Sequence, residues 1–371
     1  MSLPPALEEA TGDALPLAWP ASPWSGCYRL NPEDFQVTEE LGFEPEGEGE
    51  HLFLWIEKTG TNTQYLAEEL ARRLQLPAKA VSFSGLKDRH AVTRQWFSLH
   101  LPGQDDPDWT TLNSENWQIL AASRHRKKLK RGVHRSNHFR LRIRIDQQDP
   151  NIQNWLEERW QLLSQEGVPN YFGPQRFGRQ GQNLHFAWQW LMEKNARRPG
   201  RQKKSLWLSS LRSALFNRWL AEAVQRGDWN QALEGGCFNL AATRSQFFAT
   251  EQDSLEDLQT RISQGDLHPC GPLAGRAPST AGEPSHTQAR QLEAAFMQEW
   301  QPLVTELGKQ GLQLERRSQR LLPKMGALEW QAPWVTLNFS LPAGSFATSL
   351  LREVVTARDA SQAECGKVAD Q

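Results

Sequence analysis

The chain has 371 residues, which is enough for two or three domains with a sizeable core. Its formal net charge of -1 excludes a uniformly basic protein, and its four cysteines are too widely spaced to predict a zinc site or a dense disulfide framework. The sequence contains no run of about 18 apolar residues, the length needed to span a membrane. Its first residues lack the pattern of a signal peptide. We therefore expect a cytoplasmic protein without metal or membrane attachment.

Charge is unevenly distributed along the chain. Residues 1–50 contain eleven Asp or Glu and a single basic residue, Arg29. Residues 121–145 contain ten Lys or Arg and no acid. A basic surface can therefore exist within a neutral total, and nucleic acid remains a candidate partner.

The first third of the chain predicts a loop, then strands and one helix. Residues 1–22 are rich in Pro, Ala and Glu without periodicity, and we expect a loose leader. The segment 51–57 predicts a strand buried on both faces. Asn62 or Thr63 can cap a following helix that ends near Pro77.

Residues 80–101 predict two short strands joined by a charged loop. Val81 and Phe83 alternate with serines before the loop, and apolar residues alternate again from Phe97. Gly85 is expected to allow a tight turn. Asp88 is a single carboxylate among cations, which favour its ionised form, so it is a candidate nucleophile or base. The alternative is an ordinary solvated loop.

A basic run at 123–135 precedes a clearly alternating strand. Apolar side chains from Phe139 onward share one face of this strand, and Arg140, Arg142 and Arg144 share the other. Three arginines in a row suit a phosphate backbone, although a solvated protein face is the common alternative. A second basic run occupies residues 194–204.

The rest of the chain predicts mixed elements. We expect helices at 151–165 and 206–224 and a strand near 334–340. Residues 276–286 are expected to be mobile and residues 357–371 disordered. The pattern alone indicates an α+β protein with two domains.

Several motifs carry a resemblance to one family. The segment GLKDRHAVTRQW, residues 85–96, resembles the central motif of the TruD family of pseudouridine synthases. Further similar segments are PEDF at 32–35, KTGTNT at 58–63, NYFGPQRFG at 170–178, HPCGPLAG at 268–275 and LPAGSFAT at 341–348. The chain departs from the family's usual residues at Cys270 and at Phe346, where many members have Tyr.

The resemblance implies site residues. Asp88 corresponds to the family's catalytic nucleophile, and Phe35, Asn137, Phe139 and Phe346 correspond to substrate contacts. The roles of Lys87, Arg89 and Arg176 stay open between RNA contact and ion pair.

It also implies a fold and a reaction. We expect an α+β catalytic core with a mainly antiparallel sheet, formed by residues 1–165 and 321–371. An inserted family-specific α/β domain, residues 166–320, would complete the protein, with an RNA site lined by the basic runs.

The implied activity is isomerisation of uridine 13 of tRNA to pseudouridine by a monomer that needs no cofactor and no protein partner. An RNA-binding protein or tRNA chaperone without chemistry is the alternative. A zinc nucleobase deaminase would require a His/Cys ligand set that the sequence does not offer.

Overall fold

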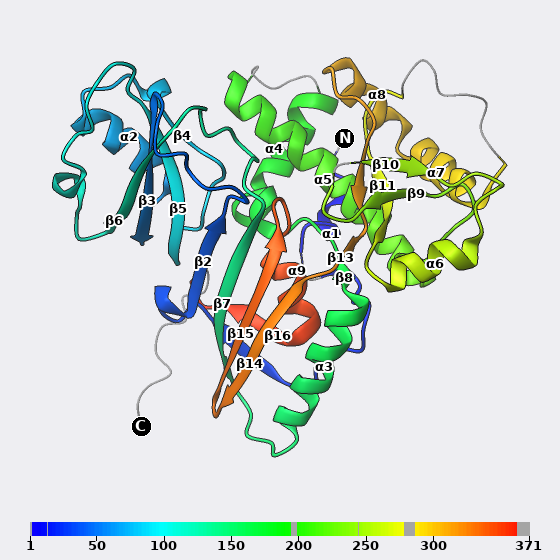
Figure 1. The fold of residues 1–371 in the computed structure, drawn as a ribbon. Helices are drawn as coiled ribbons and strands as arrows, with labels where there is room; N and C mark the ends of the chain where they lie inside the picture. The colour runs from blue at the N-terminus through cyan, green and yellow to red at the C-terminus, as the bar shows by residue number, and fades with distance from the viewer. Residues whose placement is uncertain (1, 13, 194–198, 244, 278–285, 362–371) are drawn as a thin grey trace. The chain divides into compact units, whose positions relative to one another are not determined.

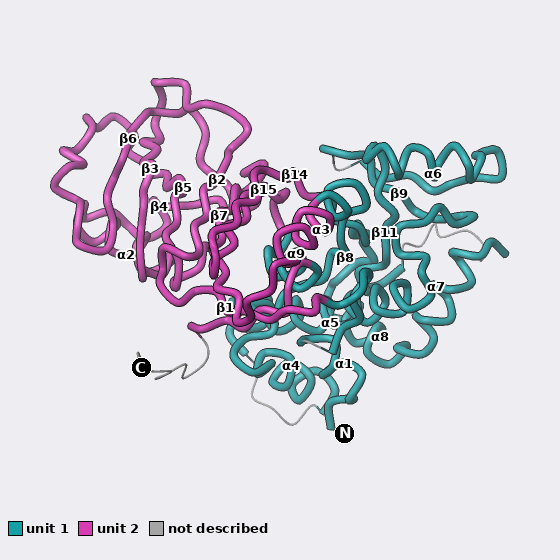
Figure 2. The backbone as a smooth tube through the Cα atoms, turned by 90° about the horizontal axis from the view of Figure 1, so that it is seen from below, with its two compact units in different colours: residues 1–21, 161–322, 345–353 teal, residues 22–160, 323–344, 354–371 magenta. Residues whose placement is uncertain are grey.

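A computed structural model gives the structure of the protein and describes residues 2–12, 14–193, 199–243, 245–277 and 286–361. The chain divides into two compact units, which Figure 2 distinguishes by colour. Unit 1 comprises residues 1–21, 161–322 and 345–353, and unit 2 comprises residues 22–160, 323–344 and 354–371. Each unit is therefore assembled from stretches that lie far apart in the sequence.

The two compact units do not test the predicted division into a catalytic core and an inserted domain, which stays a prediction. The compact units depart from its boundaries at both ends of the chain, because residues 1–21 and 345–353 pack within unit 1.

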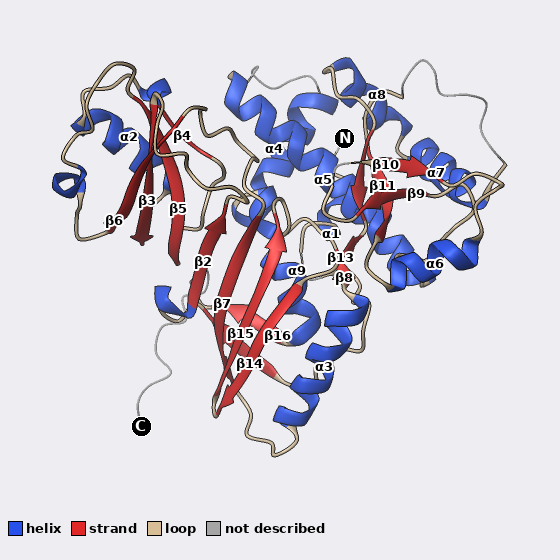
Figure 3. Ribbon diagram, viewed as in Figure 1, coloured by secondary structure: helices blue, strands red, loops and turns tan. Residues whose placement is uncertain are grey.

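Unit 2 is built on one large sheet, with its main path in the order β14-β15-β7-β2-β5-β3-β6 (Figures 1 and 3). The strands of this path are β2 (Phe35–Glu40), β3 (His51–Thr59), β5 (Val92–His100), β6 (Trp117–His125), β7 (Ser136–Ile145), β14 (Lys324–Gln331) and β15 (Trp334–Pro342). Neighbours on the path pair antiparallel, except that β2 and β5 are parallel. Two further pairs join the sheet outside the path: β1 (Ser25–Tyr28) lies between β7 and β16 (Thr356–Asp359), and β4 (Val81–Phe83) pairs with β5. The predicted α+β class with a mainly antiparallel sheet is confirmed.

Local sequence explains much of this unit. In β7 the apolar residues from Phe139 to Ile145 are buried, whereas Arg140, Arg142 and Arg144 alternate with them at partly or fully exposed positions. Helix α2 (Thr63–Arg73) begins after Asn62, whose side chain accepts hydrogen bonds from the amides of residues 64 and 65. The apolar face of α2 packs against β3, β4 and β5, which fixes the start of the loop that carries Asp88.

Unit 1 is mainly helical, with a small antiparallel sheet (Figure 3). Its helices are α1 (Pro5–Glu9), α4 (Gln182–Met192), α5 (Arg201–Arg226), α6 (Leu255–Ser263), α7 (Gln288–Glu299), α8 (Gln301–Lys309) and most of α9 (Ala347–Val354). The sheet has the order β10-β9-β11-β12, with bounds Gln246–Phe248, Cys237–Leu240, Leu267–Leu273 and Glu315–Ser318. A separate short pair joins β8 (Val168–Pro169) to β13 (Arg320–Leu321), and α3 (Ile152–Glu166) has residues in both units. The core of unit 1 is formed around α5, and the predicted helices at 151–165 and 206–224 are confirmed as α3 and the longer α5.

Two predictions for the chain ends are wrong. The segment expected to be a loose leader contains α1, and Leu7, Ala10 and Leu15 are buried in the core of unit 1. The second prediction, disorder at 357–371, is wrong at its start, where residues 357–359 belong to β16, which pairs in parallel with β1; residues 362–371 lie outside the described residues. Strand pairing depends on a distant partner, so the polar sequence TARD gave no local signal for β16. Residues 278–285 of the mobile segment predicted at 276–286 lie outside the described residues, as do residues 194–198 of the basic run at 194–204.

Among the described helices, none has both the length and the apolar character needed to cross a bilayer.

Candidate active site

Asp88 lies in the loop between β4 and β5, and the loop is held through its backbone. The buried Lys58, only 1% exposed, donates from Nζ to the carbonyl of Asp88 at 3.0 Å and to the carbonyl of Thr61 at 2.7 Å. The amide of Lys87 donates to Thr63 Oγ1 at 3.0 Å. These bonds tie the loop to the end of β3 and the start of α2, and they leave the Asp88 side chain 28% exposed.

Burial changes the acid–base behaviour of Lys58. Removal from water disfavours the charged amine and lowers the pKa of Lys58 to about 8, although the negative charge of Asp88 acts in the opposite direction. The amine is a donor in both protonation states, so it can hold the two carbonyls throughout the neutral range.

Arg29 contacts the Asp88 carboxylate. Its Nη2 lies 2.5 Å from Asp88 Oδ2, and its Nη1 lies 2.6 Å from Asp359 Oδ2. The guanidinium also lies over the ring of Phe35, 3.8 Å from the ring centroid. Arg29 has a φ of 59°, which is uncommon for a residue with a side chain. A buried, strained arginine against a partly exposed carboxylate is the arrangement expected of a functional site.

The sequence analysis did not predict a role for Arg29 or Asp359. The available signal for Arg29 was its position as the single basic residue in an acidic segment, just before the PEDF motif. For Asp359 no such signal existed.

The predicted substrate contacts Phe35 and Phe139 lie on one buried face of the sheet. Their rings meet edge to face at 6.2 Å, and Phe139 stacks on Phe339 at 5.2 Å. Tyr28 lies 6.1 Å from Phe35, and burial, with the nearby charge of Asp359, raises the pKa of Tyr28. The aromatic set is thus continuous with the Arg29 site.

Lys87 and Asn137 belong to a second polar group beside the loop. Lys87 Nζ lies 2.7 Å from Glu39 Oε2 in a buried ion pair, and Ser84 donates to the same carboxylate oxygen at 2.5 Å. Asn137 Nδ2 lies 3.3 Å from Nε2 of His134, whose pKa is lowered by burial and by the charge of Lys87. Lys87 therefore forms an ion pair within unit 2.

Gly85 lies where the chain bends after β4, close to His134. Its φ lies outside the left-handed region, and a Cβ at this position would lie 3.3 Å from His134 Cε1. The residue leaves room for the imidazole beside the loop that carries Asp88.

The predicted basic contacts in unit 2 have different environments. Arg142 lies 3.5 Å from Asp34 and stacks over Trp334 at 4.5 Å, Arg140 is half-buried, and Arg144 is exposed. The exposed Arg89 donates to the carbonyl of Gly60 at 3.1 Å.

Arg176 and Phe346 are residues of unit 1, whereas Asp88 is a residue of unit 2. Arg176 lies over the ring of Phe172 at 5.3 Å and over that of Phe346 at 5.8 Å, and it donates to Ser209. Burial lowers the pKa of Arg176. Arg317 covers Phe172 at 4.1 Å, and burial together with the charge of Arg176 lowers the pKa of Arg317 to about 9.

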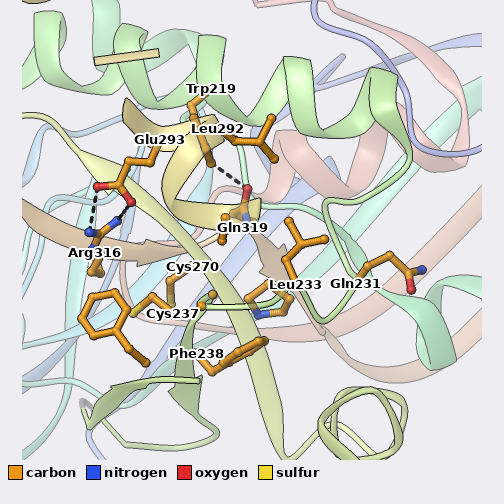
Figure 4. Close-up of a pocket in the computed structure, with 15 residues that line it drawn as sticks. Trp219, Gln231, Leu233, Cys237, Phe238, Cys270, Leu292, Glu293, Arg316 and Gln319 are labelled. Atoms are coloured by element: carbon orange, nitrogen blue, oxygen red, sulfur yellow. Dashed lines mark hydrogen bonds and ion pairs between the residues drawn. The ribbon is translucent and has the colours of Figure 1, made fainter. Parts of the chain in front are cut away.

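A small pocket in unit 1 contains none of the predicted site residues (Figure 4). Cys237 and Cys270 line it from paired strands, and Arg316 forms an ion pair with Glu293 at its edge. Its cavity volume is about 30 Å³. That is roughly the volume of one water molecule, so the pocket belongs to the packing of the unit and does not fit a nucleobase.

Taken together, the mainly antiparallel α+β fold and the Asp88–Arg29 pair define a candidate enzyme with a carboxylate at its centre. The chain matches the family model described as "tRNA pseudouridine synthase D (TruD)" over residues 16–199 and 199–354. It is 43% identical over 345 residues to tRNA pseudouridine synthase D of Methylococcus capsulatus. The aligned region covers 92% of this chain and 94% of the relative. The chain belongs to the tRNA pseudouridine synthase D family.

A solved structure agrees with the fold. A crystal structure assigned to tRNA pseudouridine synthase D of Methanosarcina mazei matches with a TM-score of 0.68 at 21% identity, covering 98% of this chain and 100% of that one.

Proposed function

We propose that this protein converts uridine 13 of tRNA to pseudouridine, with Asp88 as the nucleophile. The observation that carries the proposal is the partly exposed Asp88 carboxylate, which is held by Arg29 in a loop fixed through its backbone. Membership of the family supports the reaction class, and the GLKDRHAVT segment supports the assignment of Asp88.

The reaction exchanges one bond at the sugar for another. The Asp88 carboxylate attacks C1′ of the uridine while the bond between C1′ and N1 breaks. The released uracil turns, its C5 bonds to C1′, and the carboxylate leaves. The proton of C5 is then lost to solvent and N1, freed from the sugar, takes up a proton, so the product is an isomer of uridine and no external oxidant or reductant is needed.

In these reaction steps, Arg29 is proposed to stabilise the negative charge of Asp88. The guanidinium stabilises the ionised carboxylate before attack and again when the carboxylate leaves. The target base must leave its stack to reach Asp88. Phe35, Asn137, Phe139 and Phe346 stay the predicted substrate contacts. Candidates for contact with RNA or for ion pairs remain Arg89, Arg140, Arg142, Arg144 and Arg176.

The test is release of tritium from tRNA that contains C5-tritiated uridine. We expect release from a transcript with uridine at position 13 and none from the same transcript with cytidine there. Release from both transcripts would overturn the position. Binding without release would favour the alternative, an RNA-binding protein without chemistry.

A further inference from the structure

Asp359 and Asp88 share one guanidinium group. Arg29 donates through Nη1 to Asp359 and through Nη2 to Asp88, and the Arg29 side chain is 5% exposed. Nη2 thus meets one oxygen of Asp88, Oδ2, while Nη1 is occupied by Asp359.

Without Asp359, Arg29 would have both terminal nitrogens available for Asp88. Guanidinium groups commonly bind one carboxylate through two parallel hydrogen bonds, which would engage both oxygens of Asp88. A nucleophile held in that way would be poorly placed to attack, since attack requires an oxygen lone pair aimed at C1′. Asp359 occupies Nη1 and so closes the fork of Nη1 and Nη2 to Asp88. The other fork would need Nε, which is buried without a hydrogen-bond partner among the described residues, so the orientation of the guanidinium keeps Nε away from Asp88.

Asp359 is itself held in place. It pairs with Tyr28 in the parallel register of β1 and β16, and a hydrogen bond with Asp359 contributes to the raised pKa of Tyr28. Tyr28 therefore remains a protonated donor at neutral pH. The left-handed conformation of Arg29 also requires firm tertiary support, because it is strained for a residue with a side chain.

We infer that Asp359 is a positioning residue for the reaction: it holds one arm of Arg29 so that the guanidinium meets Asp88 through the other arm. This inference rests on the proposed function. It assigns a role to the C-terminal strand β16, in which the neighbouring Arg358 provides a matched control because its ion pair with Asp146 involves neither Arg29 nor Asp88.

The experiment compares Asp359→Asn with Arg358→Gln in the tritium-release assay. For Asp359→Asn we expect kcat to fall by about 10-fold or more, because the nucleophile is misoriented. KM should stay within about 2-fold, because no contact with RNA is removed. Arg358→Gln should match the wild type in both constants.

A double-mutant cycle separates positioning from a general loss of structure. If Asp359 acts through Arg29, Asp359→Asn should cause no further loss of kcat in an Arg29→Gln background. Equal losses in both backgrounds, or an unchanged kcat in Asp359→Asn, would overturn the inference.

Two further variants cover the case in which Asp359→Asn does not fold. Tyr28→Phe removes the hydroxyl donor and Asp359→Glu moves the carboxylate, and both should lower kcat with little change in KM. Wild-type kcat in both variants would also overturn the inference. Turnover by Asp88→Asn would instead defeat the proposed nucleophile, so the two failures are distinguishable.

Discussion

Lys58 Nζ lies 3.0 Å from the carbonyl oxygen of Asp88, so a buried amine holds the backbone of the residue proposed as nucleophile. The same amine bonds to the carbonyl of Thr61, which links the end of β3 to the loop. Lys58 thus holds the backbone of Asp88, and Arg29 contacts its carboxylate.

Titration of Lys58 should make stability depend on pH. Its folded-state pKa is lowered to about 8 by burial, so above that pH the unfolded chain binds more protons than the folded one. The free energy of unfolding should therefore rise between pH 8 and the ordinary lysine range, with a slope of up to roughly 1.4 kcal/mol per pH unit from this group.

The measurement is urea unfolding of the wild type and Lys58→Met at several pH values from 7 to 9.5. The unfolding free energy of the wild type minus that of Lys58→Met should increase as pH rises. Contributions from the other titrating groups are common to both proteins and cancel in this difference. The exposed Lys127→Met is the control and should show no such trend. A difference that does not change with pH would contradict the prediction.

Asp88→Asn should abolish pseudouridine formation and leave tRNA affinity within a few-fold. The change keeps the shape of the side chain and removes the charged nucleophile. Tritium release and filter binding measure the two quantities, and the exposed Asp105→Asn serves as control. Substantial turnover by purified Asp88→Asn would refute the assignment.

The buried Glu39–Lys87 pair should contribute to stability in a coupled way. Removing one partner leaves an uncompensated buried charge, so Glu39→Gln or Lys87→Met should lower the free energy of unfolding by about 3–5 kcal/mol. The double variant should lose less than the sum of the two single losses.

The exposed pair of Arg94 and Glu57 is a suitable comparison. There Glu57→Gln should change the free energy of unfolding by less than about 1 kcal/mol. Similar losses at both pairs in urea unfolding would show that burial does not govern the effect.

The β7 arginines should affect RNA binding unequally. Arg144 is exposed, whereas Arg142 already lies near Asp34 and Trp334. Each lost phosphate contact should reduce the log–log salt slope of tRNA binding by about 0.7–0.9, by analogy with other nucleic acids. We therefore expect Arg144→Gln to flatten the slope more than Arg142→Gln.

The triple change of Arg140, Arg142 and Arg144 to Gln should lower the slope by about 2 if all three contact phosphate. Binding titrations across salt concentrations measure it, with Arg72→Gln on α2 as control, since Arg72 pairs with Glu69. An unchanged slope in the triple variant would assign these arginines to the protein surface and not to RNA.

The sequence by itself determined the local elements and the family. Alternation predicted the strand that became β7, Asn62 predicted the start of α2, and the apolar alternation around the GLKDRHAVT segment placed Asp88 in a loop between strands. These features depend on neighbours within a few residues, where periodicity and capping act. The family resemblance likewise depends on short sequence motifs and requires no tertiary contact.

Only the tertiary structure decided what surrounds Asp88. Arg29 comes from the end of β1, Lys58 from β3 and Asp359 from a C-terminal strand without apolar alternation, and strand pairing brings them together. The same pairing places Asp359, from the first residues of the segment expected to be disordered, beside Arg29. Contacts between residues tens to hundreds of positions apart depend on sheet register and burial, which no local pattern in the chain records.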